Sequence, residues 1–172
     1  AGNANGVSLP SEVVSIRVPV NVTDKKLLIV NGFDRLDNRV NFVTNYDKRA
    51  VGPQIERGNT FNHTATYLKA VVGSTRPWSV SSCTNEAITK GRVNLSSYDA
   101  VIWYTGRESW SDETFSYTEQ QKVTDYQNAG GRMIITGSEI GWDLAAQTIG
   151  NTHTNDLPFL ENMLRTRYAG DD

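Results

Sequence analysis

The sequence feature that most constrains the fold is a short apolar run that stops at a glycine. Residues 133–135 (Met-Ile-Ile) lead through a threonine to Gly137, then come Ser138 and Glu139, then Gly141 and a segment that can be helical. This pattern is typical of a buried strand that ends in a tight turn and enters a helix, because glycine turns without a Cβ clash. Ligands of open α/β sheets bind outside the carboxyl ends of the strands. We therefore interpret this stretch as an active-site elbow.

Further apolar runs and the segments between them predict a parallel sheet. Residues 25–30 end in Asn31-Gly32, and residues 100–105 end in Gly106. Such continuous runs indicate strands that are buried on both faces. Strands that alternate with helices predict an α/β fold with a three-layer parallel sheet. The other predicted elements are a strand at residues 78–83, a short helical turn at 84–88, helices at 59–71, 114–128 and 156–166, and a further strand beginning at 167–169.

Size, charge and composition narrow the classes of protein to which the chain can belong. Its 172 residues suit one ordinary domain. The net charge of -2 gives no broad basic field, so we expect no nucleic-acid partner. No apolar run approaches the roughly 20 residues that span a bilayer, so we expect no membrane span. The single cysteine, Cys83, excludes an internal disulfide and a multi-cysteine zinc site, and without a Gly-rich phosphate loop no cofactor is expected.

We predict that the first 24 residues are separate from the main domain, and we divide the chain into residues 1–24 and an α/β domain at residues 25–172. Residues 8–18 have a proline entry and then alternating apolar residues, which is typical of a half-buried strand. This ending resembles the last strand of a fibronectin type III module. The alternative is that it forms an edge strand or arm of the main domain. Residues 36–58 are polar and lack a helical period, which predicts a functional or lid-like loop.

Polar side chains follow three of the predicted strands and should meet at one edge of the sheet. Clustered carboxylates raise each other's pKa values and can serve as acid and base, so we take them as candidate catalytic residues. Two alternatives stay open, a buried salt-bridge network and a hard-cation site built from oxygen ligands. The candidate catalytic residues are Asp34 after the first strand, Glu108 after the third and Glu139 after the fourth. The polar residues beside them are Arg35, Arg107, Ser109 and Ser138, of which Arg35, Arg107 and Ser138 are candidate ligand-binding residues.

The elbow itself departs from the serine-hydrolase pattern. In G-x-S-x-G the nucleophile stands in the middle, but that position holds Glu139, and Ser138 is displaced by one residue. His153 lies downstream and is a candidate general base, with a surface histidine of no special role as the alternative. Trp142 and Asp143 follow the elbow as candidate ligand-binding residues. Aromatic rings near carboxylates suit sugar binding, and packing in the core or loops is the alternative for the tryptophans.

Four segments of the chain carry a resemblance to a known family: residues 28–35 (LIVNGFDR), 82–87 (SCTNEA), 98–109 (with YDAVIW and GRES) and 137–144 (GSEIGWDL). They resemble a module of secreted bacterial proteins labelled xanthan lyase-like or N-acetylmuramoyl-L-alanine amidase-like. In those proteins the module follows fibronectin type III repeats. It is similar to the class I glutamine amidotransferase fold, a flavodoxin-like sheet. The resemblance covers about residues 8–172.

The resemblance implies a fold whose usual chemistry is absent. Catalytic members carry a cysteine at the middle of the elbow, where this chain has Glu139, while Asp34 and His153 loosely match a carboxylate and a histidine of a related branch. We therefore expect a non-catalytic accessory module of a secreted or cell-surface bacterial protein. Its expected partners are polysaccharide or peptidoglycan and neighbouring domains of a longer chain. The alternatives are a hydrolase (an amidase or a polysaccharide-degrading enzyme) that uses the strand-end carboxylates, and a structural spacer or assembly subunit.

Overall fold

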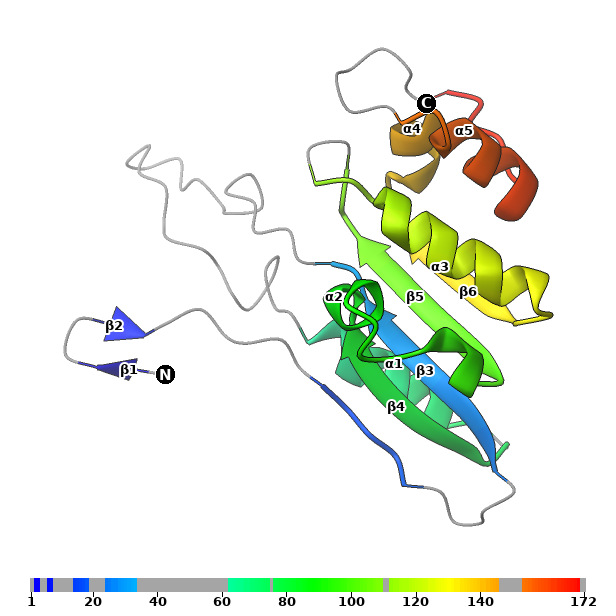
Figure 1. The fold of residues 1–172 in the computed structure, drawn as a ribbon. Helices are drawn as coiled ribbons and strands as arrows, with labels where there is room; N and C mark the ends of the chain where they lie inside the picture. Colours follow the sequence, from blue (N-terminus) through cyan, green and yellow to red (C-terminus); the bar gives the residue numbers. More distant parts are fainter. Residues whose placement is uncertain are drawn as a thin grey trace.

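A computed structural model describes residues 2–3, 6–7, 14–18, 24–33, 62–74, 76–109, 112–145 and 153–170. Four parallel strands form one sheet in the order β4-β3-β5-β6, so the predicted α/β fold with a parallel sheet is confirmed (Figure 1). A separate pair of two-residue strands, β1 and β2, is antiparallel. The bounds of the strands are β1 Gly2–Asn3, β2 Gly6–Val7, β3 Lys25–Asn31, β4 Trp78–Thr84, β5 Ala100–Gly106 and β6 Met133–Gly137.

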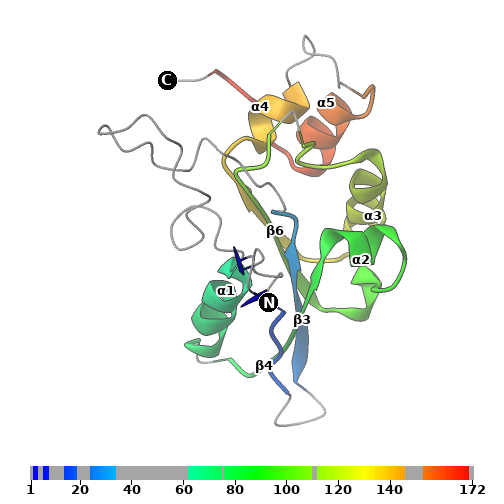
Figure 2. The same ribbon diagram turned by 90° about the vertical axis from the view of Figure 1, so that its left-hand side faces the viewer.

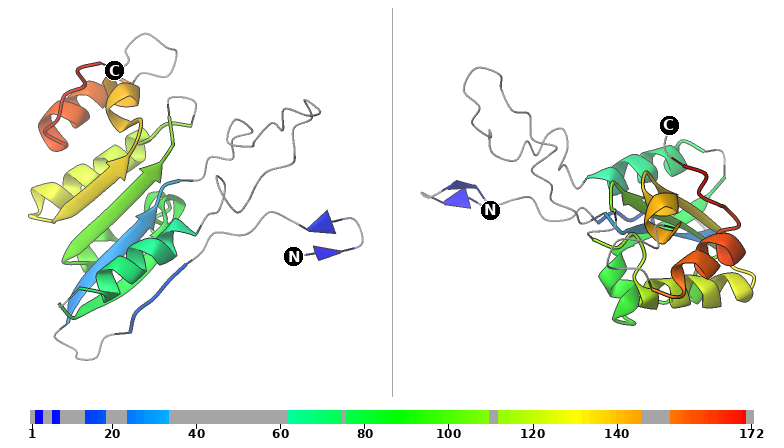
Figure 3. Two further views of the ribbon diagram at one scale, coloured as in Figure 1. Left: turned by 180° about the vertical axis from the view of Figure 1, so that it is seen from behind. Right: turned by 90° about the horizontal axis from the view of Figure 1, so that it is seen from above.

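Helices cover both faces of the sheet unequally. Figure 2 shows α1 on one side and α2 and α3 on the other, and the view from above in Figure 3 agrees. Within the described residues, no helix is long and apolar enough to cross a membrane. The bounds of the helical elements are α1 His63–Val72, α2 Asn85–Thr89, η2 Leu95–Ser97, α3 Tyr117–Asn128, α4 Ile140–Ala145, α5 Asp156–Pro158 and η3 Phe159–Met163.

The core follows from the alternation of side chains along the strands. Successive residues of a strand point to opposite faces, so the buried run in β3 supplies both sides of the sheet. Leu28, Val30 and Trp103 pack under α2, α3 and η3, whereas Leu27 and Ile29 pack under α1. Burial of a large apolar side chain stabilises the fold by about 1.5–3 kcal/mol.

Helix α3 shows how local sequence sets an element boundary. The carboxylate of Glu119 accepts hydrogen bonds from the backbone N–H and the hydroxyl of Ser116, both at 2.7 Å, so Ser116 caps the helix. The helix was predicted from residue 114, but it begins at Tyr117 because the capping box fixes Ser116 outside it. It ends before Gly130, whose φ of +86° favours glycine.

Residues 14–18 lie along the outer edge of β4. Arg17 pairs antiparallel with Val80 through two backbone hydrogen bonds of 2.8 and 3.1 Å. The hydroxyl of Ser82 accepts from the backbone N–H of Ser15 at 2.6 Å and donates to its carbonyl at 2.8 Å. If the segment is an edge strand or arm of the main domain, as the alternative interpretation proposes, this is where we expect it to lie. The fibronectin type III-like module and the boundary at residue 24 stay predictions.

Two predicted helices differ at their ends, and one predicted strand is not formed. The helix predicted at 59–71 is α1, which begins at His63; its proposed caps and the loop at 36–58 lie outside the described residues. The last helix was predicted to reach residue 166, but η3 ends at Met163, and Arg165 has a φ of +52°, which no helix accommodates. Residues 167–169 form no strand, so that prediction was wrong.

Candidate functional site

The ends of β5 and β6 adjoin at the carboxyl edge of the sheet, as predicted for a parallel pair. The carbonyl of Gly106 accepts hydrogen bonds from the backbone N–H of Ser138 at 2.9 Å and from its hydroxyl at 3.2 Å. Arg107 and Ser138 are exposed there. Figure 1 shows α4 and α5 beyond this edge. The polar residues that follow these two strands therefore share one region of the molecule.

The turn at residues 137–141 is less strained than a nucleophile elbow. Within the described residues, the non-glycine residues with positive φ are Glu113 and Arg165, so Glu139 does not have the strained backbone of that motif. Gly137 is required because a Cβ there would collide with the hydroxyl of Thr105. Gly141 has only ordinary contact with Tyr168, at 3.7 Å from the position of a Cβ. Close packing against β5, not a sharp turn, explains the first glycine.

Glu139 directly precedes α4, and Trp142 lies in the first turn of that helix. Both side chains are half-buried. Among the described residues, the carboxylate of Glu139 has no hydrogen-bond or ion-pair partner. Of the other tryptophans near this edge, Trp103 is fully buried in the core, and Trp110 lies outside the described residues. Trp142 is thus the described tryptophan that this edge offers to a ligand.

Asp143, on the same helix, is used inside the protein. Its Oδ2 accepts hydrogen bonds from the backbone N–H of Thr114 at 2.8 Å and from the Thr114 hydroxyl at 2.7 Å. Burial raises the pKa of Asp143 above its usual range; the two hydrogen bonds oppose the shift, and Asp156 and Glu113 add to it by like-charge repulsion. This pair of hydrogen bonds anchors α4 to the loop that precedes α3.

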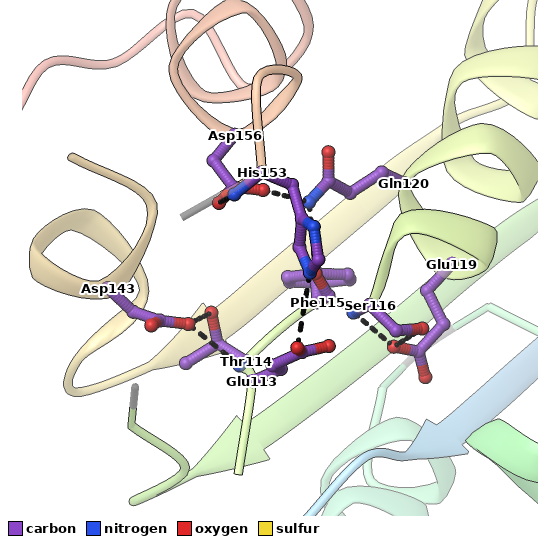
Figure 4. Close-up of polar contacts among 9 residues, drawn as sticks. All are labelled: Glu113, Thr114, Phe115, Ser116, Glu119, Gln120, Asp143, His153 and Asp156. Carbon is purple, nitrogen blue, oxygen red and sulfur yellow. Dashed lines mark hydrogen bonds and ion pairs between the residues drawn. The ribbon is translucent and has the colours of Figure 1, made fainter. Parts of the chain in front are cut away.

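His153 belongs to the same polar network, shown in Figure 4. Its Nε2 lies 3.2 Å from Oε1 of Glu113, and its backbone N–H donates to Oδ2 of the buried Asp156 at 2.8 Å. Asp156 in turn accepts a hydrogen bond of 2.7 Å from Nε2 of Gln120. Glu113 has a φ of +56°, where glycine would be less strained. A buried network therefore positions a partly exposed histidine–glutamate pair.

Of the other candidate residues, Glu108 is buried, and Asp34 and Arg35 lie outside the described residues. Glu108 is only 2 % exposed, and neither it nor Arg107 is unpaired. The predicted roles of Asp34 and Arg35 stay predictions. His153 contacts Glu113, and no described contact joins it to Glu139. Among the described residues, no group of three or more His, Cys, Asp or Glu could hold a metal ion.

Sequence reasoning missed the contributions of Glu113, Thr114 and Asp156. One signal was available, because the Ser116-x-x-Glu119 capping box places the residues before it in a loop at the carboxyl edge. Nothing in the sequence indicates the positive φ of Glu113, a conformation that is usually occupied by glycine or asparagine. Comparisons of the chain with models of protein families, with curated proteins and with solved structures found no match.

Proposed function

We propose that this chain is a non-catalytic module that binds a glycan through Glu139 and Trp142 at the carboxyl edge of its sheet. The half-buried carboxylate of Glu139, which has no partner among the described residues, carries the proposal. The carboxylates of Asp143, Asp156 and Glu119, by contrast, accept hydrogen bonds from other groups of the protein. Glu139 therefore keeps its acceptor oxygens for a ligand.

The chemistry of the pair suits a sugar. A carboxylate accepts hydrogen bonds from adjacent sugar hydroxyls, and hydrogen bonds to a charged group contribute about 1.5–3 kcal/mol each. An indole ring three residues away offers an apolar face to the C–H surface of the sugar ring. Partial burial of both groups supports this use, because a restricted side chain loses less entropy on binding.

The fold supports a finer assignment as well. Numbered along the chain, the parallel strands have the order 2-1-3-4, which agrees with the first four strands of the flavodoxin-like order. We therefore propose a flavodoxin-like domain similar to class I glutamine amidotransferases. Secretion or display at a bacterial surface, a cell-wall polymer as ligand and a preceding fibronectin type III-like module belong to the same proposal and rest on the sequence resemblance alone.

Binding is tested by tryptophan fluorescence during titration with a panel of soluble neutral and charged polysaccharides and peptidoglycan fragments. We expect at least one ligand to change the emission, Trp142→Leu to abolish the change and Glu139→Gln to weaken binding about tenfold, or about 1.4 kcal/mol. Trp78→Leu is the matched control, because Trp78 begins β4 at the opposite edge of the sheet. No response to any ligand would contradict the proposal and favour a structural spacer.

Hydrolysis is a second candidate, favoured by the pair of His153 and Glu113. A carboxylate that holds an imidazole by one nitrogen leaves the other to act as a general base toward water. Here Glu113 lies at 3.2 Å and Asp156 fixes the backbone of His153. In this candidate the general acid is the protonated form of a carboxyl group such as that of Glu139.

Turnover of amide and glycoside substrates separates the two candidates. A hydrolase should lose at least about a hundredfold in rate in His153→Gln, because general acid–base catalysis contributes about 10²–10⁴-fold. Glu139→Gln should also reduce the rate, and unchanged turnover would remove Glu139 from the mechanism. A module that binds glycan without turnover in the wild-type chain would exclude this second candidate for the substrates tested.

A further inference from the structure

The β6 strand exposes one complete row of side chains. Burial alternates along residues 132–138, and the side chains of even number face solvent while those of odd number are half-buried. Ile134 is 63 % exposed, although it lies in the middle of a strand. We call this row the β6 stripe; its members are Arg132, Ile134, Thr136 and Ser138.

Such a row is unusual in a parallel sheet. Parallel sheets occur with both faces covered, and their strands are buried on both sides. On the face that carries Ile134, the described helix is α1, which contacts β3 and β4 (Figure 2). No described strand pairs with the outer edge of β6 either, so its backbone N–H and C=O groups on that side lack a ladder partner within the described ranges. An open edge of this kind is a template for another strand.

The charges at the two ends of β6 determine which strand would fit. Arg132 precedes the strand and Glu139 follows it, and no residue of β6 itself is charged. Neither side chain has an ion-pair partner among the described residues. A parallel copy of β6 would place arginine beside arginine, whereas an antiparallel copy would place each arginine near a glutamate. The strand is therefore complementary to itself in the antiparallel direction.

We propose that β6 is an interface between two copies of this chain, which pair antiparallel about a two-fold axis at Ile135. This inference goes beyond the proposed binding function; because the pairing engages Glu139, the partner's Arg132 and a bound ligand would compete for that carboxylate. Ile135 is the middle residue of β6. In a two-fold interface residue i meets j and j meets i. Ile134 then packs beside the partner's Thr136, and Arg132 lies opposite the partner's Ser138, next to the partner's Glu139.

The pairing continues the sheet across the axis and places the β6 stripe beside that of the partner on the same face. Two β-branched residues, Ile134 and the partner's Thr136, face each other twice by symmetry, and such cross-strand pairs contribute to sheet stability. The oppositely charged ends add two ion pairs at the rim of the interface. Rim charges chiefly determine specificity and orientation, so here they select the antiparallel copy.

The test is sedimentation equilibrium of the whole chain from low micromolar to millimolar concentration. We expect a reversible dimer that Ile134→Lys abolishes. Ile16→Lys is the matched control, because Ile16 is 71 % exposed on the arm beside β4 at the opposite edge of the sheet. Arg132→Glu should raise the dimer dissociation constant about tenfold, and adding Glu139→Arg to that variant should restore it.

Three results would contradict the proposal. A chain that stays monomeric at every concentration would show that β6 does not pair with a second copy and leave its edge for a different segment. A dimer that survives Ile134→Lys would place the interface elsewhere. A double charge-reversal variant as weak as Arg132→Glu alone would overturn the antiparallel register.

Discussion

The two edges of the sheet differ in what lies beside them. At β4 the outer edge is met by residues 14–18, held by the Arg17–Val80 bridge and by the hydroxyl of Ser82. At β6, within the described residues, no strand is paired with the outer edge, and Ile134 faces solvent. The difference shows that, among the described residues, hydrogen bonds from the chain's own arm cover one edge of the sheet, while the other edge has no paired strand.

The largest expected effect is the difference in unfolding free energy between replacing a buried isoleucine and replacing an exposed one in the same sheet. Ile29 in β3 is fully buried under α1, and replacing a buried Ile with Ala costs about 2–5 kcal/mol of unfolding free energy. Ile134→Ala in β6 should cost about 0.5 kcal/mol, as for surface substitutions. Urea unfolding at low protein concentration measures both. Equal costs would show that β6 is as well covered as β3.

The anchor between α4 and the loop before α3 should give the next effect. Asp143→Ala leaves the N–H of Thr114 without its acceptor, which costs about 1–3 kcal/mol. Asp143→Asn keeps an acceptor oxygen and removes a half-buried charge near Asp156 and Glu113, so its unfolding free energy at neutral pH should equal or exceed that of the wild type.

The same residue predicts a pH dependence. The folded-state pKa of Asp143 is raised above its ordinary value of 3.8, so the folded chain binds more protons between the two values. Its contribution to the unfolding free energy therefore falls as pH rises through that window. Urea unfolding of the wild type and Asp143→Asn across acidic pH should show this slope in the wild type only. An identical slope in both would assign the effect to another group.

Loss of the Ser82 hydroxyl should loosen the arm and leave the rest of the sheet intact. Ser82→Ala removes two hydrogen bonds to Ser15, each with a net contribution of about 0.5–1.5 kcal/mol. Hydrogen exchange at the amides of Arg17 and Val80 should accelerate roughly five- to tenfold, while the amides of β3 stay protected. Acceleration throughout the sheet would show that the arm is part of the global folding unit.

The smallest effect belongs to an exposed ion pair at the amino end of β3. Asp99 accepts from the backbone N–H of Lys26 at 2.8 Å and from Nζ of Lys25 at 2.9 Å, and these bonds lower its pKa. Its contribution is present above pH 3.8 and is lost as pH falls through the lowered value. Exposed pairs are worth about 0–1 kcal/mol, so Asp99→Asn should shift the melting temperature little, and less in high salt.

Much of the sheet could be predicted from the sequence, because its strands are continuous apolar runs that stop at glycine or a polar turn. The start of α3 could be narrowed to Ser116 or Thr118 from their capping chemistry. The end of η3 could not be predicted, since no sequence signal indicates the positive φ of Arg165. The uncovered face of β6 was also unpredictable, because Ile134 belongs to an apolar run like those of the buried strands.

The candidate site was predictable at the level of the sheet edge and not at the level of contacts. The elbow pattern predicted Ser138 and Glu139 at the carboxyl edge of the sheet, and Ser138 is hydrogen-bonded there to Gly106 at the end of β5. The partner of His153 could not be foreseen, because Glu113 is 40 residues away and reaches it through an unusual backbone conformation. Residue types at a strand end predict where chemistry is located, whereas long-range packing decides which groups meet.

The central claim, that Trp142 and Glu139 bind a glycan, is tested most directly by the indole N–H signals in a ¹⁵N-correlated NMR spectrum. The four tryptophans give one signal each, and that of Trp142 is identified by its absence in Trp142→Phe. We predict that titration with a bound polysaccharide fragment shifts the Trp142 signal and leaves that of the buried Trp103 in place. If the Trp142 signal stays fixed while a ligand binds, or no ligand of the panel shifts it, the claim is contradicted.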